Sequence, residues 1–253
     1  MLTEKGITHP IVVKLGGSIV TRKDKPYTPN KEAIDKLADI LSGYYRSNGQ
    51  LILVHGGGSY GHYAVEEARK RKGVLDIVDV AQVQKRMLEL SVIIASSLIE
   101  HGLPVSIHPA HTLCKSENDC CFDVIIEDLS NALVPMTYGD IIATDKGYKI
   151  ISGDDLTLWL ASTTGSRKIL FVMDQPGVLD KTGKVMERVT PRTLGEVGRI
   201  VKKESVDVTG GIAKKLESAL EFVADHDVEV RVVDIDGLKE ILSGGKAGTI
   251  ITK

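Results

Sequence analysis

Short runs of apolar residues alternate along the chain with longer segments in which apolar side chains recur every three or four positions. A short run that stops at a glycine or a polar residue is typical of a buried strand, whereas the longer period is typical of an amphipathic helix. Strands are expected at 11–15, 51–54, 105–107, 169–173, 229–233 and 248–251, with a hairpin at 141–151. Helices are expected at 31–46, 64–69, 79–100, 152–160, 193–202 and 238–242, and one more is expected to begin at about 211. This order predicts an α/β fold with a mainly parallel sheet covered by helices on both faces.

Two parts of the pattern are less regular. Residues 114–127 fit neither period, and we expect a small hairpin there. Near 149–152 the kinds of motif change, which indicates a boundary between two lobes of one domain, about 1–150 and about 151–253. No internal repeat and no low-complexity segment interrupts the chain.

The composition argues against several classes of protein. The formal net charge is -2, which does not favour general affinity for nucleic acid or for an anionic membrane. No apolar run approaches the roughly 20 residues that span a bilayer, and the first residues lack the apolar core of a signal peptide. The three cysteines, Cys114, Cys120 and Cys121, have no metal-ligand spacing, so we expect free thiols and a cytoplasmic location.

A glycine loop follows the apolar run 51–54 and has the sequence His55-Gly56-Gly57-Gly58-Ser59-Tyr60-Gly61-His62. Glycines let a backbone approach an anion closely, and the N-terminus of a following helix attracts negative charge. The loop matches neither the G-x-G-x-x-G nor the P-loop pattern. By itself it indicates either an anion site at a strand end or a tight turn without a ligand.

Two further glycine pairs have a lysine nearby. Lys14 precedes Gly16-Gly17-Ser18, and Gly210-Gly211 precedes Lys215. Because ligands collect at the carboxyl ends of strands in an open α/β sheet, the three sets are expected to converge there. Lysines around one anion-rich cleft favour phosphoryl transfer, which depends on positioning and on charge neutralisation.

Five motifs occur in an order that resembles the amino-acid kinase superfamily: residues 13–18, 138–140, 152–154, 207–211 and 248–249. Within it, the loop 55–62 is similar to that of the isopentenyl phosphate kinase family. The resemblance implies a three-layer α/β/α sandwich and a homodimer. It also implies transfer of the γ-phosphoryl group of ATP, with Mg²⁺, to isopentenyl phosphate, an isoprenoid monophosphate, which gives isopentenyl diphosphate in isoprenoid biosynthesis.

The resemblance assigns roles to individual residues. It places Lys14 and Lys215 on either side of the transferring phosphoryl group, with Asp154 holding the two lysines. The residues that it assigns to ATP are Lys14, Gly16, Gly17, Ser18, Lys23, Gly58, Asp174, Gly177, Gly211 and Lys215. The residues that it assigns to the acceptor are Gly57, Ser59, His62 and Gly139. No protein metal ligand is assigned.

The chain departs from the family pattern after the strand that ends at Met173. The family has two acids and a tyrosine in this loop, whereas this chain keeps only Asp174 and Gly177. The family places that loop near the nucleoside.

Other interpretations stay open from the sequence. Asp154 can also cap the helix that follows it, and the apolar stripe at 80–98 can serve the core, a dimer interface or the acceptor tail. His55, His108 and His111 are expected to be structural. The alternative functions are a kinase for a phosphonate such as fosfomycin or for an amino-acid carboxylate, and a nucleotide-binding module without turnover.

Overall fold

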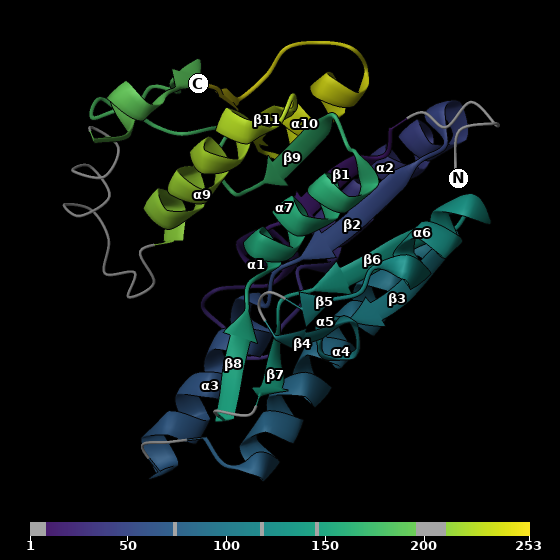
Figure 1. Cartoon of the computed structure of the whole chain (residues 1–253), viewed down its shortest axis with the longest axis vertical. Helices are drawn as coiled ribbons and strands as arrows, with labels where there is room; N and C mark the ends of the chain where they lie inside the picture. Colours follow the sequence, from purple (N-terminus) through teal and green to yellow (C-terminus); the bar gives the residue numbers. More distant parts are fainter. Residues whose placement is uncertain (1–8, 73–74, 117–118, 145–146, 196–210) are drawn as a thin grey trace.

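A computed structural model describes residues 9–72, 75–116, 119–144, 147–195 and 211–253. Its centre is an eight-stranded sheet with the order β10-β12-β11-β9-β1-β2-β6-β3, and helices cover both faces (Figure 1). All neighbouring pairs in this sheet are parallel except β11 and β12. The predicted three-layer α/β/α sandwich with a mainly parallel sheet is confirmed.

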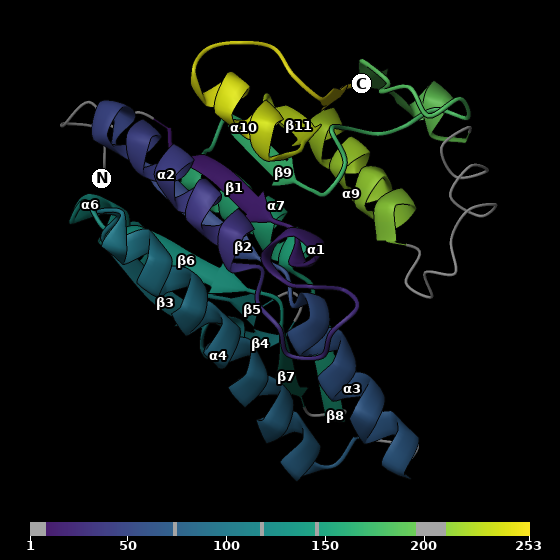
Figure 2. The ribbon, with the colours of Figure 1, turned by 180° about the vertical axis from the view of Figure 1, so that it is seen from behind.

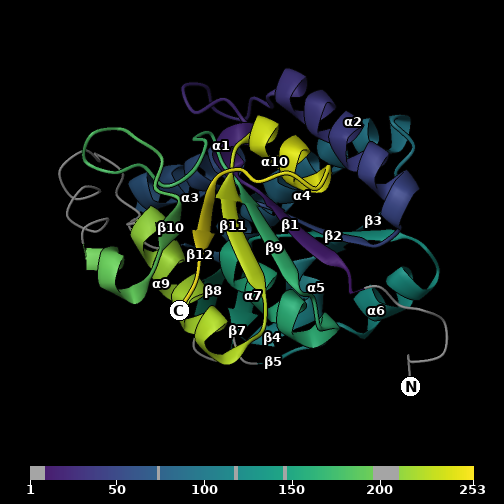
Figure 3. The ribbon, with the colours of Figure 1, turned by 90° about the horizontal axis from the view of Figure 1, so that it is seen from above.

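The strands of this sheet are short. Their bounds are β1 (Ile11–Leu15), β2 (Leu51–His55), β3 (Val105–Pro109), β6 (Val134–Tyr138), β9 (Lys168–Val172), β10 (Arg188–Val189), β11 (Glu229–Val233) and β12 (Thr249–Ile251). The view from above shows β12, β11, β9, β1 and β2 side by side (Figure 3). The two lobes expected from the sequence therefore share one sheet, since β1 and β9 are direct neighbours.

Helices on the two faces bury alternate residues of each strand. The bounds of the helices are α1 (Gly17–Val20), α2 (Lys31–Asn48), α3 (Gly58–Lys72), α4 (Ile77–Glu100), α5 (Ala110–Leu113), α6 (Asp123–Ser130), α7 (Gly153–Thr164), α9 (Gly211–Asp225) and α10 (Ile235–Leu242). In β1, Val13 and Leu15 pack with α2, α4 and α10, whereas Val12 packs with α7 and α9. Figure 2 shows the first of these faces and Figure 1 the second. A side chain's place in the strand thus fixes which helices it meets.

The predicted elements are found with a few changes of extent. The helix α3 begins at Gly58, six residues before the expected start, because the glycine loop continues directly into it. The prediction for 193–202 lies largely outside the described residues. None of the helices in the described ranges is both long and apolar enough to cross a membrane.

Within the described part of the chain, two small hairpins lie outside the main sheet. The strands β7 (Asp140–Thr144) and β8 (Gly147–Ile151) form the hairpin expected at 141–151. The strands β4 (Cys114–Ser116) and β5 (Asp119–Cys120) form a second one within the segment where a hairpin was expected, and the helix α6 after it was not anticipated.

The expectation of three free thiols is wrong. Cys114 and Cys120 lie directly opposite each other in the β4–β5 pair and form a disulfide, while Cys121 is free and exposed. The hairpin is the physical reason, because cross-strand neighbours are held at the short separation that a disulfide needs. Composition alone does not show this pairing.

Candidate active site

The carboxyl ends of β1, β2 and β9 meet at one edge of the sheet. Leu15 is in register with His55 on one side and with Val172 on the other. The chain proceeds from β1 to β2 on the first side, while β9 adds on the second, so the strand order reverses at β1. Such a reversal opens a crevice at the carboxyl edge of a parallel sheet. Gly16, Gly17 and Ser18 make the turn from β1 into α1 at this place, beside the loop 56–58.

The loops 16–18 and 56–58 touch through backbone, and we call this contact the glycine interface. A Cβ atom on Gly17 would lie 2.3 Å from the backbone nitrogen of Gly58, and one on Gly56 would lie 2.9 Å from the nitrogen of Gly17. A Cβ atom on Gly58 would lie 2.1 Å from Thr21 Oγ1. Gly58 also has φ of +47°, in the left-handed region that favours glycine. The structure therefore leaves no room for side chains at this interface.

Thr21 connects the two loops, and sequence reasoning missed it. Its hydroxyl donates to the Gly17 carbonyl at 2.7 Å and accepts the Ser59 N–H at 2.9 Å. A threonine four residues after Gly17 in a short helical turn is the signal that was available, since such hydroxyls bond the i−4 carbonyl. The hydroxyl of Ser59 accepts the Thr28 N–H at 3.4 Å, so this predicted acceptor ligand is used within the protein.

Lys14, Asp154 and Lys215 form a lysine–aspartate cluster at the same edge. The Nζ atom of Lys14 lies 2.8 Å from Asp154 Oδ1, and the Nζ atom of Lys215 lies 2.7 Å from the same oxygen. Lys14 shares a strand face with Val12 and therefore points toward α7, which carries Asp154, and α9, which carries Lys215. The three predicted catalytic residues, far apart in sequence, are thus brought together.

The electrostatics of the cluster follow from two ammonium groups that share one carboxylate. Burial raises the pKa of Asp154, but the charges of Lys14 and Lys215 outweigh burial and lower the pKa to about 2. Burial, together with the charge of Lys14, lowers the pKa of Lys215 to about 8, against the attraction of Asp154. The face of Phe171 lies beneath the Lys215 ammonium, with 5.2 Å from Nζ to the ring centroid.

The position of Asp154 does not come from helix capping. The hydroxyl of Ser152 accepts the Asp155 N–H at 3.0 Å, so Ser152 is the N-cap of α7 and the capping interpretation of Asp154 is wrong. Asp154 lies in the first turn, where the helix dipole favours a negative charge. The cap leaves its carboxylate free for the two lysines.

The residues predicted for the acceptor surround the end of β2. Gly139, between β6 and β7, donates its N–H to the His55 carbonyl at 3.2 Å. A Cβ atom on Gly139 would lie 2.8 Å from the Gly153 nitrogen, so this turn packs directly against the start of α7. His62 is exposed in the second turn of α3, and Gly57 immediately precedes that helix. Helical side chains lean toward the N-terminus, which directs His62 back toward the glycine loop.

The remaining residues predicted to bind ATP lie on the β9 side of β1. The Nζ atom of Lys23 contacts Asp174 Oδ2 at 2.8 Å, which joins the loop after α1 to the loop after β9. Gly177 packs against Thr249, whose Oγ1 would lie 2.7 Å from an added Cβ. Gly211 is the first residue of α9. The motif residues 207–210 lie outside the described residues.

Comparison with known proteins identifies the family of the chain. Residues 9–234 match the model of the Amino acid kinase family. The isopentenyl phosphate kinase of Methanocaldococcus jannaschii is 32% identical over 222 residues, covering 81% of this chain and 85% of that protein. The isopentenyl phosphate kinase of Haloferax volcanii is 32% identical over 249 residues, covering 95% and 98% respectively.

A solved structure shows the same fold. The structure of the T. acidophilum isopentenyl phosphate kinase product complex matches with a TM-score of 0.77 and 24% identity, covering 96% of this chain and 99% of that chain. From the matched residues and the identity to these relatives, the chain belongs to the amino acid kinase family and, within it, to the isopentenyl phosphate kinases.

Proposed function

We propose that the chain transfers the γ-phosphoryl group of ATP to isopentenyl phosphate and so forms isopentenyl diphosphate for isoprenoid synthesis. The observation that carries the proposal is the lysine–aspartate cluster beside the glycine interface, at the carboxyl edge of the sheet. The relatives with 32% identity, which bear the name isopentenyl phosphate kinase, support this acceptor.

The two lysines act by neutralising charge. An ammonium group has three N–H donors, and the contact with Asp154 uses one from each lysine. The remaining donors can reach the transferring phosphoryl group, whose negative charge is spread over its oxygens in the transition state. Asp154 keeps the two cations close together, which they would otherwise resist.

Proton abstraction is not part of the proposal. The acceptor is a phosphate oxygen that is already anionic at neutral pH, so transfer needs no general base. Asp154, with a pKa of about 2, is also too weak a base for that role. The barrier to be lowered is the repulsion between two polyanions, which cations and N–H donors reduce.

We propose that Mg²⁺ binds together with ATP. The described residues contain no group of three or more His, Cys, Asp or Glu arranged to hold a metal ion, and the carboxylate of Asp154 is shared by two lysines. This donor set fits an ion carried mainly by phosphate oxygens, as is common for Mg²⁺ in kinases. The ion would supply further neutralisation of phosphate charge.

Two organisational features belong to the same proposal. We assign the acceptor to the lobe 1–150 and ATP mainly to the lobe 151–253, although one continuous sheet joins them. We also propose a cytoplasmic location, where ATP is made and used, although the Cys114–Cys120 disulfide removes the expectation of free thiols that had supported it.

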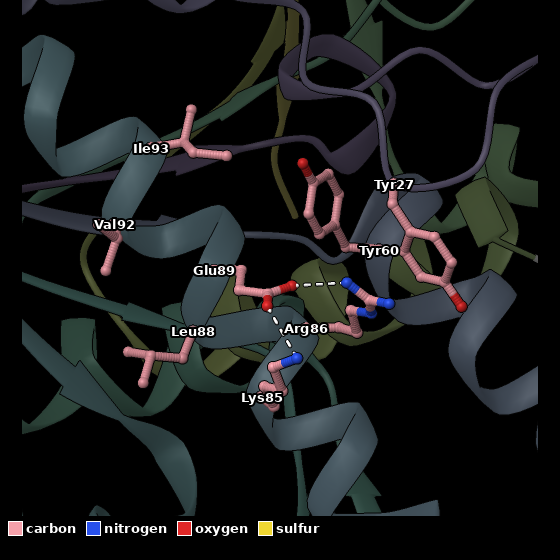
Figure 4. Close-up of a pocket in the computed structure, with 8 residues that line it drawn as sticks. All are labelled: Tyr27, Tyr60, Lys85, Arg86, Leu88, Glu89, Val92 and Ile93. Atoms are coloured by element: carbon pink, nitrogen blue, oxygen red, sulfur yellow. Dashed lines mark hydrogen bonds and ion pairs between the residues drawn. The ribbon is translucent and has the colours of Figure 1, made fainter.

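We propose a homodimer through the outer face of α4. Leu88, Val92 and Ile99 are 43%, 49% and 54% exposed and lie on one stripe of this helix. Leu88 and Val92 also line a cavity of about 500 Å³, in which Lys85 and Arg86 both contact Glu89 (Figure 4). A second copy related by a two-fold axis would cover the apolar stripe and place these charges of both signs across the interface.

The mass in solution tests the dimer. We expect the wild-type protein to be a dimer by size-exclusion chromatography with light scattering, and Val92→Glu to be a monomer. Val124→Glu is the matched control, because Val124 is exposed at 38% on α6, away from this stripe. A monomeric wild type, or a dimer that survives Val92→Glu, would contradict the assigned face.

A panel of acceptors tests the reaction. Isopentenyl phosphate, fosfomycin and acetylglutamate are each incubated with Mg²⁺-ATP and followed by phosphorus NMR. We expect the paired signals of a diphosphate monoester and of ADP with isopentenyl phosphate alone. Turnover of another acceptor without isopentenyl phosphate would overturn the substrate assignment, and ATP binding without any turnover would indicate a nucleotide-binding module.

A further inference from the structure

His55 is a buried histidine at the last position of β2, immediately before the glycine loop. Its side chain lies on the strand face of Leu51 and Leu53, toward α4. There its Nε2 atom lies 2.5 Å from the hydroxyl of Ser91, and its Nδ1 atom lies 3.1 Å from the carbonyl oxygen of Gly56. Its ring also stacks on Tyr138, with centroids 5.0 Å apart.

These contacts determine where the ring carries its proton. A carbonyl oxygen can only accept, so Nδ1 must donate to Gly56. Nε2 then accepts from the Ser91 hydroxyl, which can donate. Burial keeps the ring neutral, since it lowers the pKa of His55 to about 4. The neutral ring is therefore the Nδ1–H tautomer, held between α4 and the glycine loop.

The bond to the Gly56 carbonyl fixes a second group of the same peptide. The C=O of Gly56 and the N–H of Gly57 belong to one planar trans peptide and point in opposite directions. With the carbonyl directed to His55, the Gly57 N–H is directed away from that ring and from α4, on which Ser91 lies. None of the hydrogen bonds found among the described residues uses that N–H.

We propose that His55 is a positioning residue that aims the Gly57 N–H at the acceptor phosphate, with the Ser91 hydroxyl satisfying the Nε2 atom of the tautomer that the Gly56 carbonyl requires. The inference rests on the proposed function, because it takes the acceptor phosphate to be the group that Gly57 binds. His55 itself touches no substrate. It acts by preventing a flip of the Gly56–Gly57 peptide. A flipped peptide would present the Gly56 carbonyl oxygen, instead of the Gly57 N–H, to the anion.

Two amide substitutions separate this role from simple packing. In His55→Asn the side-chain amide lies near the place of Nδ1 and can still donate to Gly56, whereas in His55→Gln it lies near the place of Nε2. We expect His55→Gln to raise the KM for isopentenyl phosphate about fivefold or more, in keeping with a lost hydrogen bond, with a smaller change in kcat. His55→Asn should keep this KM within about twofold to threefold of wild type. Equal changes in the two variants, or none in His55→Gln, would overturn the proposal.

The tautomer is measured on the unmodified enzyme, so neither misfolding of a variant nor absence of turnover affects it. Nitrogen-15 NMR of histidine-labelled protein should show His55 with a protonated Nδ1 and an unprotonated Nε2 at neutral pH, and Ser91→Ala should broaden or shift the Nε2 signal. A protonated Nε2 in the wild type would overturn the assignment. A wild type with this tautomer but no turnover of isopentenyl phosphate would contradict the proposed function and leave the geometry of His55 standing.

Discussion

The lysine–aspartate cluster and the glycine interface lie at the same edge of the sheet but are built in opposite ways. The cluster consists of long side chains from β1, α7 and α9 that share a single carboxylate oxygen. The glycine interface consists of backbone from the turns after β1 and β2 in direct contact, with the Thr21 hydroxyl bonded to both turns. One region therefore depends on charge, whereas the other depends on close approach and has no room for added atoms.

The largest expected effect is the loss of one charge from the cluster. We expect Lys14→Ala or Lys215→Ala to lower kcat by about 100-fold or more, because each lysine stabilises charge that develops in the transition state. Lys36→Ala is the control, since Lys36 forms an exposed pair with Glu32 on α2. Steady-state kinetics with saturating substrates measure the effect. Near-normal kcat in either cluster variant would show that this region does not act through charge.

The next effect concerns added volume at the glycine interface. We expect Gly58→Ala to destabilise the fold by about 2 kcal/mol or more, through crowding against Thr21 and a left-handed backbone. Gly43→Ala is the matched control, because a Cβ atom there meets nothing within 4 Å in the helix α2, and it should stabilise by about 0.5–1 kcal/mol. Thermal unfolding of the two variants compares them. Equal melting temperatures would contradict the close contact.

A smaller effect is expected at His62, which we assign to the acceptor end. A hydrogen bond to a charged group is worth about 1.5–3 kcal/mol, so His62→Ala should raise the KM for isopentenyl phosphate about tenfold or more. The KM for ATP should change much less, and His62→Gln, which keeps a donor, should recover part of the loss. Paired saturation curves for the two substrates give both constants. An equal rise in both would place His62 in the fold or at the nucleotide.

Features that follow from the alternation of side chains along a strand were predictable from the sequence. The position of Lys14 on the same face as Val12 follows from simple alternation, and the carboxyl edge follows from the parallel sheet. The expected elements that lie within the described residues are also found, because their apolar patterns are regular. The shared carboxylate of Asp154 was expected only from the family resemblance, since nothing local brings residues 14, 154 and 215 together.

Contacts that depend on tertiary packing were not predictable. The place of Thr21 four residues after Gly17 indicates its bond to the Gly17 carbonyl, but nothing local indicates that it also accepts the Ser59 N–H and so joins the two glycine loops. His55, which meets Ser91 on a helix 36 residues later, carries no local signal that distinguishes it from an ordinary polar residue. The disulfide was missed for the same reason, since it depends on the register of a two-residue strand. The early start of α3 at Gly58 also runs against the low helix propensity of glycine.

The pH dependence of kcat/KM for ATP tests most directly whether Lys14, Asp154 and Lys215 act as one charged unit. Lys215 is charged below its pKa of about 8 in the free enzyme, so kcat/KM should fall as the pH rises through about 8. Asp154 favours the charged form of Lys215, so Asp154→Asn should lower that pKa further and move the fall to lower pH by about one unit or more. A wild-type profile that stays flat through this range, or a fall at the same pH in Asp154→Asn, would contradict the shared-carboxylate account.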